Sequence, residues 1–323
     1  MDPTWKYLAL PGLVLLAACR IIPPTPGGED GLRVLWDQGT FTEGPVVDEA
    51  GTVLFTDLRR NLIRRYDPRS GETTIYRENS GSANGLAFDH AGNLLACEGA
   101  DGGRRRISIT ARDGQVKTLV DHYQGRKFNS PNDIAVAPNG DIYFTDPRYR
   151  GPESVDLDFE GVFLVRGKKA VLASRDTERP NGILVSADGR SVFVADNNNR
   201  EGGARTLLKF DIAADGTLEN KQVLYRFGND QRGIDGMAMD AAGRIYAAAG
   251  KGEDAGIYIF TQEGHLRDRI KVPDLPTNCT FGGPDHPNTL YITAQVKTGA
   301  DGTPRFGLFR IRLGSGGSKA SGR

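Results

Sequence analysis

The polar and apolar positions of this chain alternate over short distances from residue 31 to residue 313. Runs of about five residues, rich in β-branched and aromatic side chains, are separated by Gly, Asn, Asp and Pro. No segment in this range has a convincing helical period. Clear examples of such runs are residues 52–56, 141–145, 191–195, 244–248 and 289–293. The pattern therefore predicts an all-β fold with tight turns, which the 42 glycines also favour.

The runs belong to a repeat that occurs six times. Each repeat contains a polar turn, and the turns end at Gly51, Gly92, Gly140, Gly189, Gly243 and Asn288. A repeat of about 40–50 residues that holds four strands is typical of a β-propeller blade. We therefore predict a six-bladed β-propeller over residues 31–313. The last repeat shows three strands, so residues 32–37 are expected to add the fourth and close the ring.

An oxygen-bearing side chain stands eight residues before the end of each turn. These residues are Glu43, Asn84, Asn132, Asn181, Asp235 and Thr280. If the repeats close into a ring, the six positions converge at one mouth of its central channel. Glu43, Asn132, Asn181 and Asp235 would offer oxygen ligands alone, which favour one hard divalent cation, Ca²⁺ first, with Mg²⁺, Mn²⁺ or Zn²⁺ as alternatives. The other interpretation is a polar ring that binds loops and water, although burying two carboxylates without a cation is costly.

A second set of carboxylates ends the strand that follows each turn. It consists of Asp57, Glu98, Asp146 and Asp196. These side chains could form a second ring near the first. Alternatively they cap the backbone amides of loops, as Asp commonly does. The sequence leaves both interpretations open.

Composition and charge exclude several classes of function. The chain of 323 residues has 41 basic and 41 acidic residues, so a nucleic-acid-binding surface is not expected. None of the four histidines, His90, His122, His265 and His286, occupies the ring position, which disfavours a catalytic triad or a histidine zinc site. Cys97 and Cys279 are too few for a disulfide framework, and Cys97 is expected to be buried in a strand.

The two ends of the chain have a different composition. Residues 7–18 form an apolar run that ends in Leu16-Ala17-Ala18-Cys19, similar to a bacterial lipoprotein box. We expect residues 1–18 to be a signal peptide, Cys19 to be lipid-modified, residues 19–30 to be a Pro/Gly-rich tether and residues 314–323 to be a disordered tail. The protein would then be exported and anchored at the bacterial cell envelope by its lipid alone. The alternative is an ordinary cleaved signal with an incidental cysteine.

Several motifs resemble the family of gluconolactonase, regucalcin and senescence-marker protein, and most closely its bacterial gluconolactonase type. They follow the order of that family and span nearly the whole predicted propeller: Thr42-Glu43-Gly44-Pro45, Asn129-Ser130-Pro131-Asn132-Asp133, Tyr143-Phe144-Thr145-Asp146-Pro147, Pro180-Asn181-Gly182-Ile183, Ile234-Asp235-Gly236-Met237 and Cys279-Thr280-Phe281-Gly282-Gly283. The resemblance implies hydrolysis of a small-molecule lactone. It also implies a single divalent cation on Glu43, Asn132, Asn181 and Asp235.

The chain departs from the animal regucalcin-like pattern at two substrate positions. Ser130 stands where those proteins carry Arg, and Tyr149 stands where they carry a substrate-facing Glu. Asn84 and Glu98 are further expected substrate contacts. For the mechanism we expect the cation to polarise the lactone carbonyl and Asp235 to take the proton of the attacking water, with Glu98 as a weaker candidate for that base. The rival hypotheses are a non-catalytic binding module with a structural cation, and a different esterase on the same site.

Overall fold

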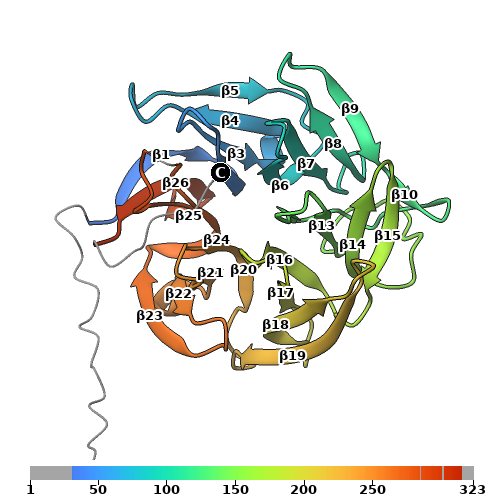
Figure 1. Cartoon of the computed structure of the whole chain (residues 1–323). Coiled ribbons are helices and arrows are strands. Elements are labelled where there is room, and N and C mark those ends of the chain that lie inside the picture. The colour runs from blue at the N-terminus through green and yellow to red at the C-terminus, as the bar shows by residue number, and fades with distance from the viewer. Residues whose placement is uncertain (1–30, 284, 300–301, 315–323) are drawn as a thin grey trace, which may run out of the picture.

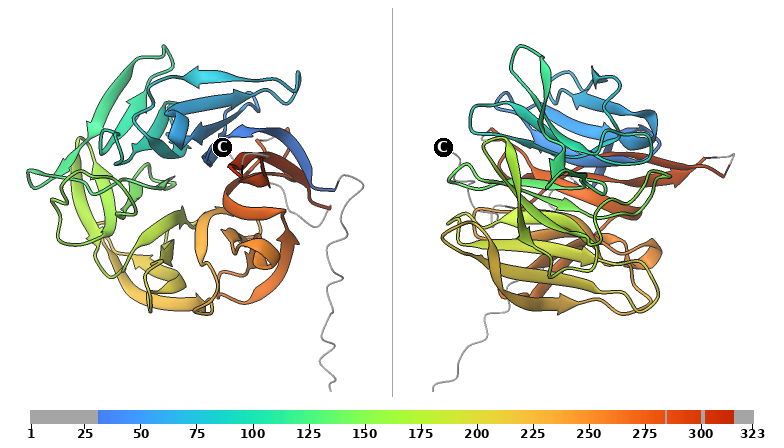
Figure 2. Two further views of the ribbon diagram at one scale, coloured as in Figure 1. Left: turned by 180° about the vertical axis from the view of Figure 1, so that it is seen from behind. Right: turned by 90° about the vertical axis from the view of Figure 1, so that its right-hand side faces the viewer.

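The computed structural model describes residues 31–283, 285–299 and 302–314. Nearly all regular structure in this part of the chain is β, with two short 3-10 turns, η1 (Leu58–Arg60) and η2 (Gly252–Asp254). Six four-stranded sheets follow one another around a ring (Figure 1). Seen from the side, the ring is a thick disc (Figure 2). The predicted six-bladed propeller is confirmed.

In the first five blades the strands run from the axis outwards in chain order. The first three blades are β2 (Thr42–Val47), β3 (Val53–Asp57), β4 (Leu62–Tyr66) and β5 (Thr73–Arg77); β6 (Ala83–Phe88), β7 (Leu94–Glu98), β8 (Arg106–Thr110) and β9 (Val116–Val120); and β12 (Ile134–Val136), β13 (Ile142–Asp146), β14 (Gly161–Arg166) and β15 (Lys169–Ser174). The fourth and fifth blades are β16 (Pro180–Val185), β17 (Ser191–Asn197), β18 (Arg205–Ile212) and β19 (Leu218–Arg226); and β20 (Ile234–Met239), β21 (Ile245–Ala249), β22 (Gly256–Phe260) and β23 (Leu266–Lys271). A small hairpin of β10 (His122–Tyr123) and β11 (Arg126–Lys127) lies between the second and third blades.

The sixth blade contains both ends of the described chain. Its strands are β24 (Asp274–Phe281), β25 (Thr289–Thr298) and β26 (Pro304–Arg312), and the N-terminal β1 (Arg33–Gly39) pairs antiparallel with β26 as the outer strand. Figure 1 shows blue β1 beside red β26. The predictions for residues 1–30 and 315–323, including the signal peptide, Cys19 and most of the tail, lie outside the described residues and stay predictions. No helix in the described part is long and apolar enough to cross a membrane.

The core is divided among the six interfaces between neighbouring blades. Alternate side chains of one strand serve two different interfaces, because successive residues of a strand point to opposite faces of the sheet. In β3, Val53 and Phe55 pack with Tyr291 and Leu308 of the sixth blade, whereas Leu54 packs against the second blade. Cys97 is buried in β7, as predicted, and lies in the equivalent cluster between the second and third blades. Since both faces of each blade are buried, second strands such as β3, β7 and β21 are buried at every residue.

The polar turns produce the tight hairpins that set the register of the inner strands. Asp48 shows how: its carboxylate accepts hydrogen bonds from the backbone N–H groups of Ala50 (2.9 Å) and Thr52 (2.8 Å). Gly51 completes that turn with φ = 81°, a conformation that side chains with a Cβ rarely adopt. Asp89 and Asp240 make the same pair of contacts in their own hairpins.

Candidate functional site

Five of the six predicted ring residues occupy equivalent positions on or next to the inner strands. In four blades, the residue just before the ring position pairs with a residue near the end of the second strand. In the second blade, for example, Ala83 pairs with Glu98 and is followed by the ring residue Asn84. Glu43, Asn181 and Asp235 follow such a paired residue in the same way. The corresponding pairs elsewhere are Thr42 with Asp57, Pro180 with Asp196, and Ile234 with Ala249. Asn132 lies just before β12. The inner strands contact one another in ring order, so these positions share one mouth of the channel.

The prediction that Thr280 takes the sixth ring position is wrong. Pro276 pairs with Ala294 and Cys279 with Ile292, the spacing that Ala83 and Leu86 show in the second blade, so the equivalent residue is Thr277. The turn between β24 and β25 is longer than the others, and counting back from Asn288 therefore ends too late. Thr277 is fully buried, and its hydroxyl donates to the carbonyl of Thr42 (2.7 Å), so it joins the last blade to the first.

Two buried carboxylates meet in the ring. Glu43 and Asp235 are each 4% exposed. Burial raises the pKa of Glu43 well above its usual range, and the negative charge of Asp235 raises it further. The side-chain amide of Asn181 lies near the Asp235 carboxylate and helps to lower its pKa. The structure thus brings together three of the four predicted metal ligands, taken from the first, fourth and fifth blades.

The fourth predicted ligand, Asn132, is fixed by its backbone. Its N–H donates to Thr145 O (2.9 Å), and its carbonyl accepts a short hydrogen bond from Gly85 N (2.7 Å) in the neighbouring blade. Within the described residues no group of three His, Cys, Asp or Glu side chains could hold a metal ion. The expected set has two carboxylates and two amides instead. Such oxygen donors fit a hard divalent cation, which would also offset the two buried negative charges.

A second layer of the ring, one residue further along each inner strand, contains Asp133 and Asn278. The Asn278 side chain approaches the Asp133 carboxyl from the opposite blade of the propeller and helps to lower its pKa. Gly85 and Gly236 allow this crossing: a Cβ at Gly85 would lie 2.5 Å from Asp133 Oδ1, and one at Gly236 would lie 1.9 Å from Asn278 Cγ. Asp133 also accepts hydrogen bonds from Ile134 N (3.0 Å) and Ile183 N (3.3 Å), while burial raises its pKa to about 7. The pair lies where the polar mouth meets a channel of about 390 Å³.

Tyr149 contacts a predicted metal ligand. Its hydroxyl donates to Asn197 O (2.9 Å) and accepts a hydrogen bond from Asn181 Nδ2 (3.2 Å). The Arg179 guanidinium lies 5.1 Å from the centre of its ring. Because the amide nitrogen of Asn181 is held by Tyr149, its oxygen is the atom left to bind a cation. The contact to substrate that the sequence suggested stays a prediction, but the hydroxyl has a defined place beside Asn181.

We expect the variant Tyr149→Phe to bind divalent cations about tenfold more weakly, because partners that orient a metal ligand typically contribute that much. The fold should be retained, since the ring of the side chain stays in place. Isothermal titration of the protein with Ca²⁺ measures the effect. An affinity equal to that of the wild type would show that Tyr149 does not orient Asn181.

Ser130 and Asn84, two further expected substrate contacts, lie on neighbouring blades. The Ser130 hydroxyl accepts a hydrogen bond from Ala100 N (2.9 Å), which joins it to the loop after β7. Asn84 is half-buried at the start of β6, and its carbonyl accepts from the Thr56 hydroxyl (3.1 Å). Both therefore belong to the mouth at which Glu43 and Asp235 meet. Their contact with substrate stays a prediction.

Three of the four carboxylates that end the second strands cap loop amides. Asp57 Oδ1 accepts from Thr40 N (3.0 Å), and Asp146 accepts from Asn129 N and Ser130 N (both 2.7 Å). Asp196 likewise accepts from Glu178 N and Arg179 N. These contacts favour the capping interpretation over a second ring of ligands. The loops that they hold in place lead directly into the inner strands.

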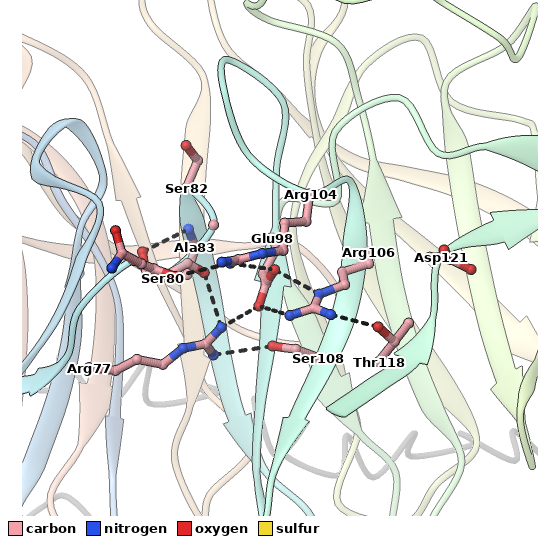
Figure 3. A network of polar contacts seen from close by, with 12 residues as sticks. Arg77, Ser80, Ser82, Ala83, Glu98, Arg104, Arg106, Ser108, Thr118 and Asp121 are labelled. Carbon is pink, nitrogen blue, oxygen red and sulfur yellow. Dashed lines mark hydrogen bonds and ion pairs between the residues drawn. The ribbon is translucent and has the colours of Figure 1, made fainter. Parts of the chain in front are cut away.

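Glu98 differs from those three because arginines surround it (Figure 3). Its fully buried carboxylate accepts hydrogen bonds from Arg77 Nη2 (2.5 Å), Arg104 Nη1 (3.2 Å) and Arg106 Nε (2.8 Å). Arg77 lies on the first blade and the others belong to the second, so the cluster joins two blades. Since its oxygens are enclosed by guanidinium groups, we leave Glu98 out of the proposed reaction.

The sequence of the propeller matches that of a known protein family. The family model described as "SMP-30/Gluconolactonase/LRE-like region" matches residues 41–296. The chain belongs to this family. The match covers the propeller from the loop before β2 into β25, and so includes every residue of the ring. The resemblance drawn from the sequence motifs is therefore confirmed.

Relatives in this family include named enzymes. A gluconolactonase from Zymomonas mobilis is 30% identical over 306 residues, which cover 85% of this chain and 82% of the relative. Regucalcin from Xenopus laevis is 27% identical over 256 residues, 78% and 82% of the two chains. Among solved structures, a gluconolactonase from Xanthomonas campestris superposes with a TM-score of 0.75 at 27% identity and covers 89% of this chain and 91% of its own.

Proposed function

We propose that this protein is a lactonase, an ester hydrolase that opens a gluconolactone-like sugar lactone to its hydroxy acid with the help of one divalent cation. The observation that carries the proposal is the meeting of Glu43, Asn181 and Asp235 at one mouth of the channel. The family supports it, since relatives of this chain include gluconolactonases and a lactonohydrolase from Aspergillus oryzae (25% identical; 64% of this chain and 49% of the relative).

Glu43, Asn132, Asn181 and Asp235 would hold the cation, with Ca²⁺ as the first choice and Mg²⁺, Mn²⁺ or Zn²⁺ as alternatives. A bound divalent cation supplies Lewis-acid polarisation of the lactone carbonyl. The donor set suits this because two carboxylates balance the charge of the ion and the amides add ligands without further repulsion. Tyr149 holds the amide of Asn181 in the orientation that this requires.

Asp235 is the residue that we assign as the base. Burial raises its pKa, whereas the adjacent guanidinium of Arg232 lowers it and so favours the ionised form that can accept a proton. The carboxylate takes a proton from water as the water oxygen adds to the carbonyl carbon. The bond from that carbon to the ring oxygen then breaks, and the proton passes to the ring oxygen as the new hydroxyl. The product is an open-chain hydroxy acid.

The test is acid release from glucono-1,5-lactone by the purified full chain with Ca²⁺, Mn²⁺ or Zn²⁺. Turnover that a chelator abolishes and metal restores supports the proposal. Metal binding without turnover of any lactone or ester would instead indicate a binding module, and turnover of aryl esters alone would indicate a different esterase. Either of these results contradicts the lactonase.

In the same assay, the variant Asn181→Ala is expected to bind the cation at least tenfold more weakly, because it loses one oxygen ligand. Its fold should be retained, since Asn181 lies at the mouth rather than in an interface core. Titration with Ca²⁺ and circular dichroism measure the two effects. Unchanged metal affinity would remove Asn181 from the ligand set.

A further inference from the structure

Arg232 lies beside the proposed ligands, and its guanidinium contacts the proposed base, Asp235. It stands three residues before Asp235, in the connection that leads into β20. Its Nη2 donates to Asp235 Oδ2, and its Nη1 donates to Pro276 O (2.9 Å) in the next blade. Its side chain is 24% exposed, against 6% for Asp235. The guanidinium therefore reaches from solvent to the carboxylate at the centre of the site.

The positive charge of Arg232 acts across the mouth of the channel. Burial raises the pKa of Glu43 in the first blade, and Arg232 is one of the groups that oppose this. Burial likewise raises the pKa of Tyr149 in the third blade, and Arg232 again acts in the opposite direction. The guanidinium lies between the fifth and sixth blades at this mouth, since it donates to Asp235 of one blade and to Pro276 of the other.

Two neighbouring arginines, Arg148 and Arg179, have largely buried side chains and form hydrogen bonds with other groups. Arg179 donates to both oxygens of Glu160 (2.9 and 3.0 Å), and its side chain is 5% exposed. Arg148 is 9% exposed and donates to Glu153 and to the carbonyls of Asn129 and Gly151. Of these three arginines, Arg232 combines accessible surface with contact to the proposed reacting centre.

We propose that Arg232 contacts the acyl group of the substrate and donates to the oxygen on which negative charge develops when the lactone opens. This inference rests on the proposed lactonase function. A guanidinium has five N–H donors in a fixed fork, a geometry that suits a carboxylate. Within the described chain two of the five donors are used, on Asp235 and Pro276, so three are left for a ligand. The preferred ligand class is the carboxylate of the hydroxy-acid product.

The charges of the site give Arg232 two effects of opposite sign. Glu43, Asp133 and Asp235 bring carboxyl groups to the ring, and ring opening adds the negative charge of the product. The guanidinium stabilises that added charge, so it favours the transition state and the bound product. The same positive charge repels a divalent cation at Asp235, so it weakens metal binding. A residue with a purely structural role would not separate the two effects.

The experiment compares Arg232→Gln, Arg232→Lys and a control in the wild-type background. For Arg232→Gln we expect kcat/KM for glucono-1,5-lactone to fall about 100-fold and the dissociation constant of D-gluconate to rise about tenfold. Ca²⁺ affinity, measured by competition with a chelating dye, should rise about tenfold.

The variant Arg232→Lys keeps the positive charge but lacks the forked N–H donors of the guanidinium. Its Ca²⁺ affinity should be near that of the wild type, and its kcat/KM should lie between those of the wild type and Arg232→Gln. The control is Arg244→Gln, since Arg244 pairs with Asp240 at the far end of the same blade; it should change none of the three values.

Two results would overturn the proposal. One is an Arg232→Gln protein that keeps wild-type turnover and gluconate affinity. The other is a protein in which Ca²⁺ affinity and activity fall together, since that indicates a structural role. If the wild type opens no lactone at all, the proposed function fails, but calorimetric binding of D-gluconate to the Ca²⁺-loaded wild type and variants still tests the anion contact by itself.

Discussion

The variant Asp235→Ala is expected to lose metal-dependent lactone opening, with kcat/KM reduced at least about 10³-fold. Asp235 is the proposed base and also a proposed ligand, so its removal affects both proton transfer and cation binding. Its carboxylate also accepts a hydrogen bond from Arg232. Initial rates of acid release, together with a Ca²⁺ titration of the same preparation, measure the two losses.

A matched control separates this effect from general damage to the fifth blade. Asp240 is also buried in that blade and also pairs with an arginine, Arg244 (2.6 Å), but it lies at the hairpin end. The variant Asp240→Asn should lose some stability and keep its turnover per folded molecule. Comparable activity losses in Asp235→Ala and Asp240→Asn would contradict the assignment of Asp235. Full activity in Asp235→Ala would contradict it outright.

The fold and the ring residues could be predicted because both repeat. A hairpin turn fixes the register of its inner strand, so counting back from the turn identifies the residue at the mouth in five blades. In the sixth blade the count gives the wrong residue because the turn there is longer. The sequence of that repeat alone does not reveal the extra length. Thr277 rather than Thr280 therefore takes the position.

The residues that the sequence did not reveal depend on contacts between distant parts of the chain. Asp133 and Asn278 meet across the axis from opposite blades, and Gly85 and Gly236 provide the space. Nothing local to Asp133 indicates its partner. Arg232 lies in an irregular connection outside the repeat, so the ring pattern does not include it. A comparison of the second-layer residues of all six blades could have singled out Asp133, because Gly occupies that position in four of them.

The carboxylates of the second strands show a different limit of sequence reasoning. An Asp that caps loop amides and an Asp that binds a ligand occupy the same position in the repeat. The structure separates them by their neighbours, since backbone N–H groups point at Asp57, Asp146 and Asp196. At Glu98 the partners are arginines contributed by strands of two blades and by the loop after β7.

The largest loss of stability is expected for Glu98→Ala, about 3–5 kcal/mol of unfolding free energy. Removing one member of a buried ionic cluster leaves its partners charged and unpaired, and here Arg77 and Arg106 have side chains that are only 10% and 17% exposed. Urea unfolding measures the change. Turnover per folded molecule should stay near the wild-type value, because the carboxylate faces arginines and not the ring.

The variant Glu49→Ala is the matched control, since Glu49 and Arg112 also link the first two blades but are both exposed. An exposed pair contributes little, so the midpoint of unfolding should not change measurably.

For Glu98 itself, burial favours the neutral acid, but hydrogen bonds from Arg106 and Arg77 outweigh burial and lower its pKa. Its stabilisation is therefore fully present above the pKa of an unfolded glutamate, about 4.3, and is lost as the pH falls through the lower folded-state pKa. A Glu98→Ala protein with normal stability and lost turnover would return Glu98 to the reaction as its base.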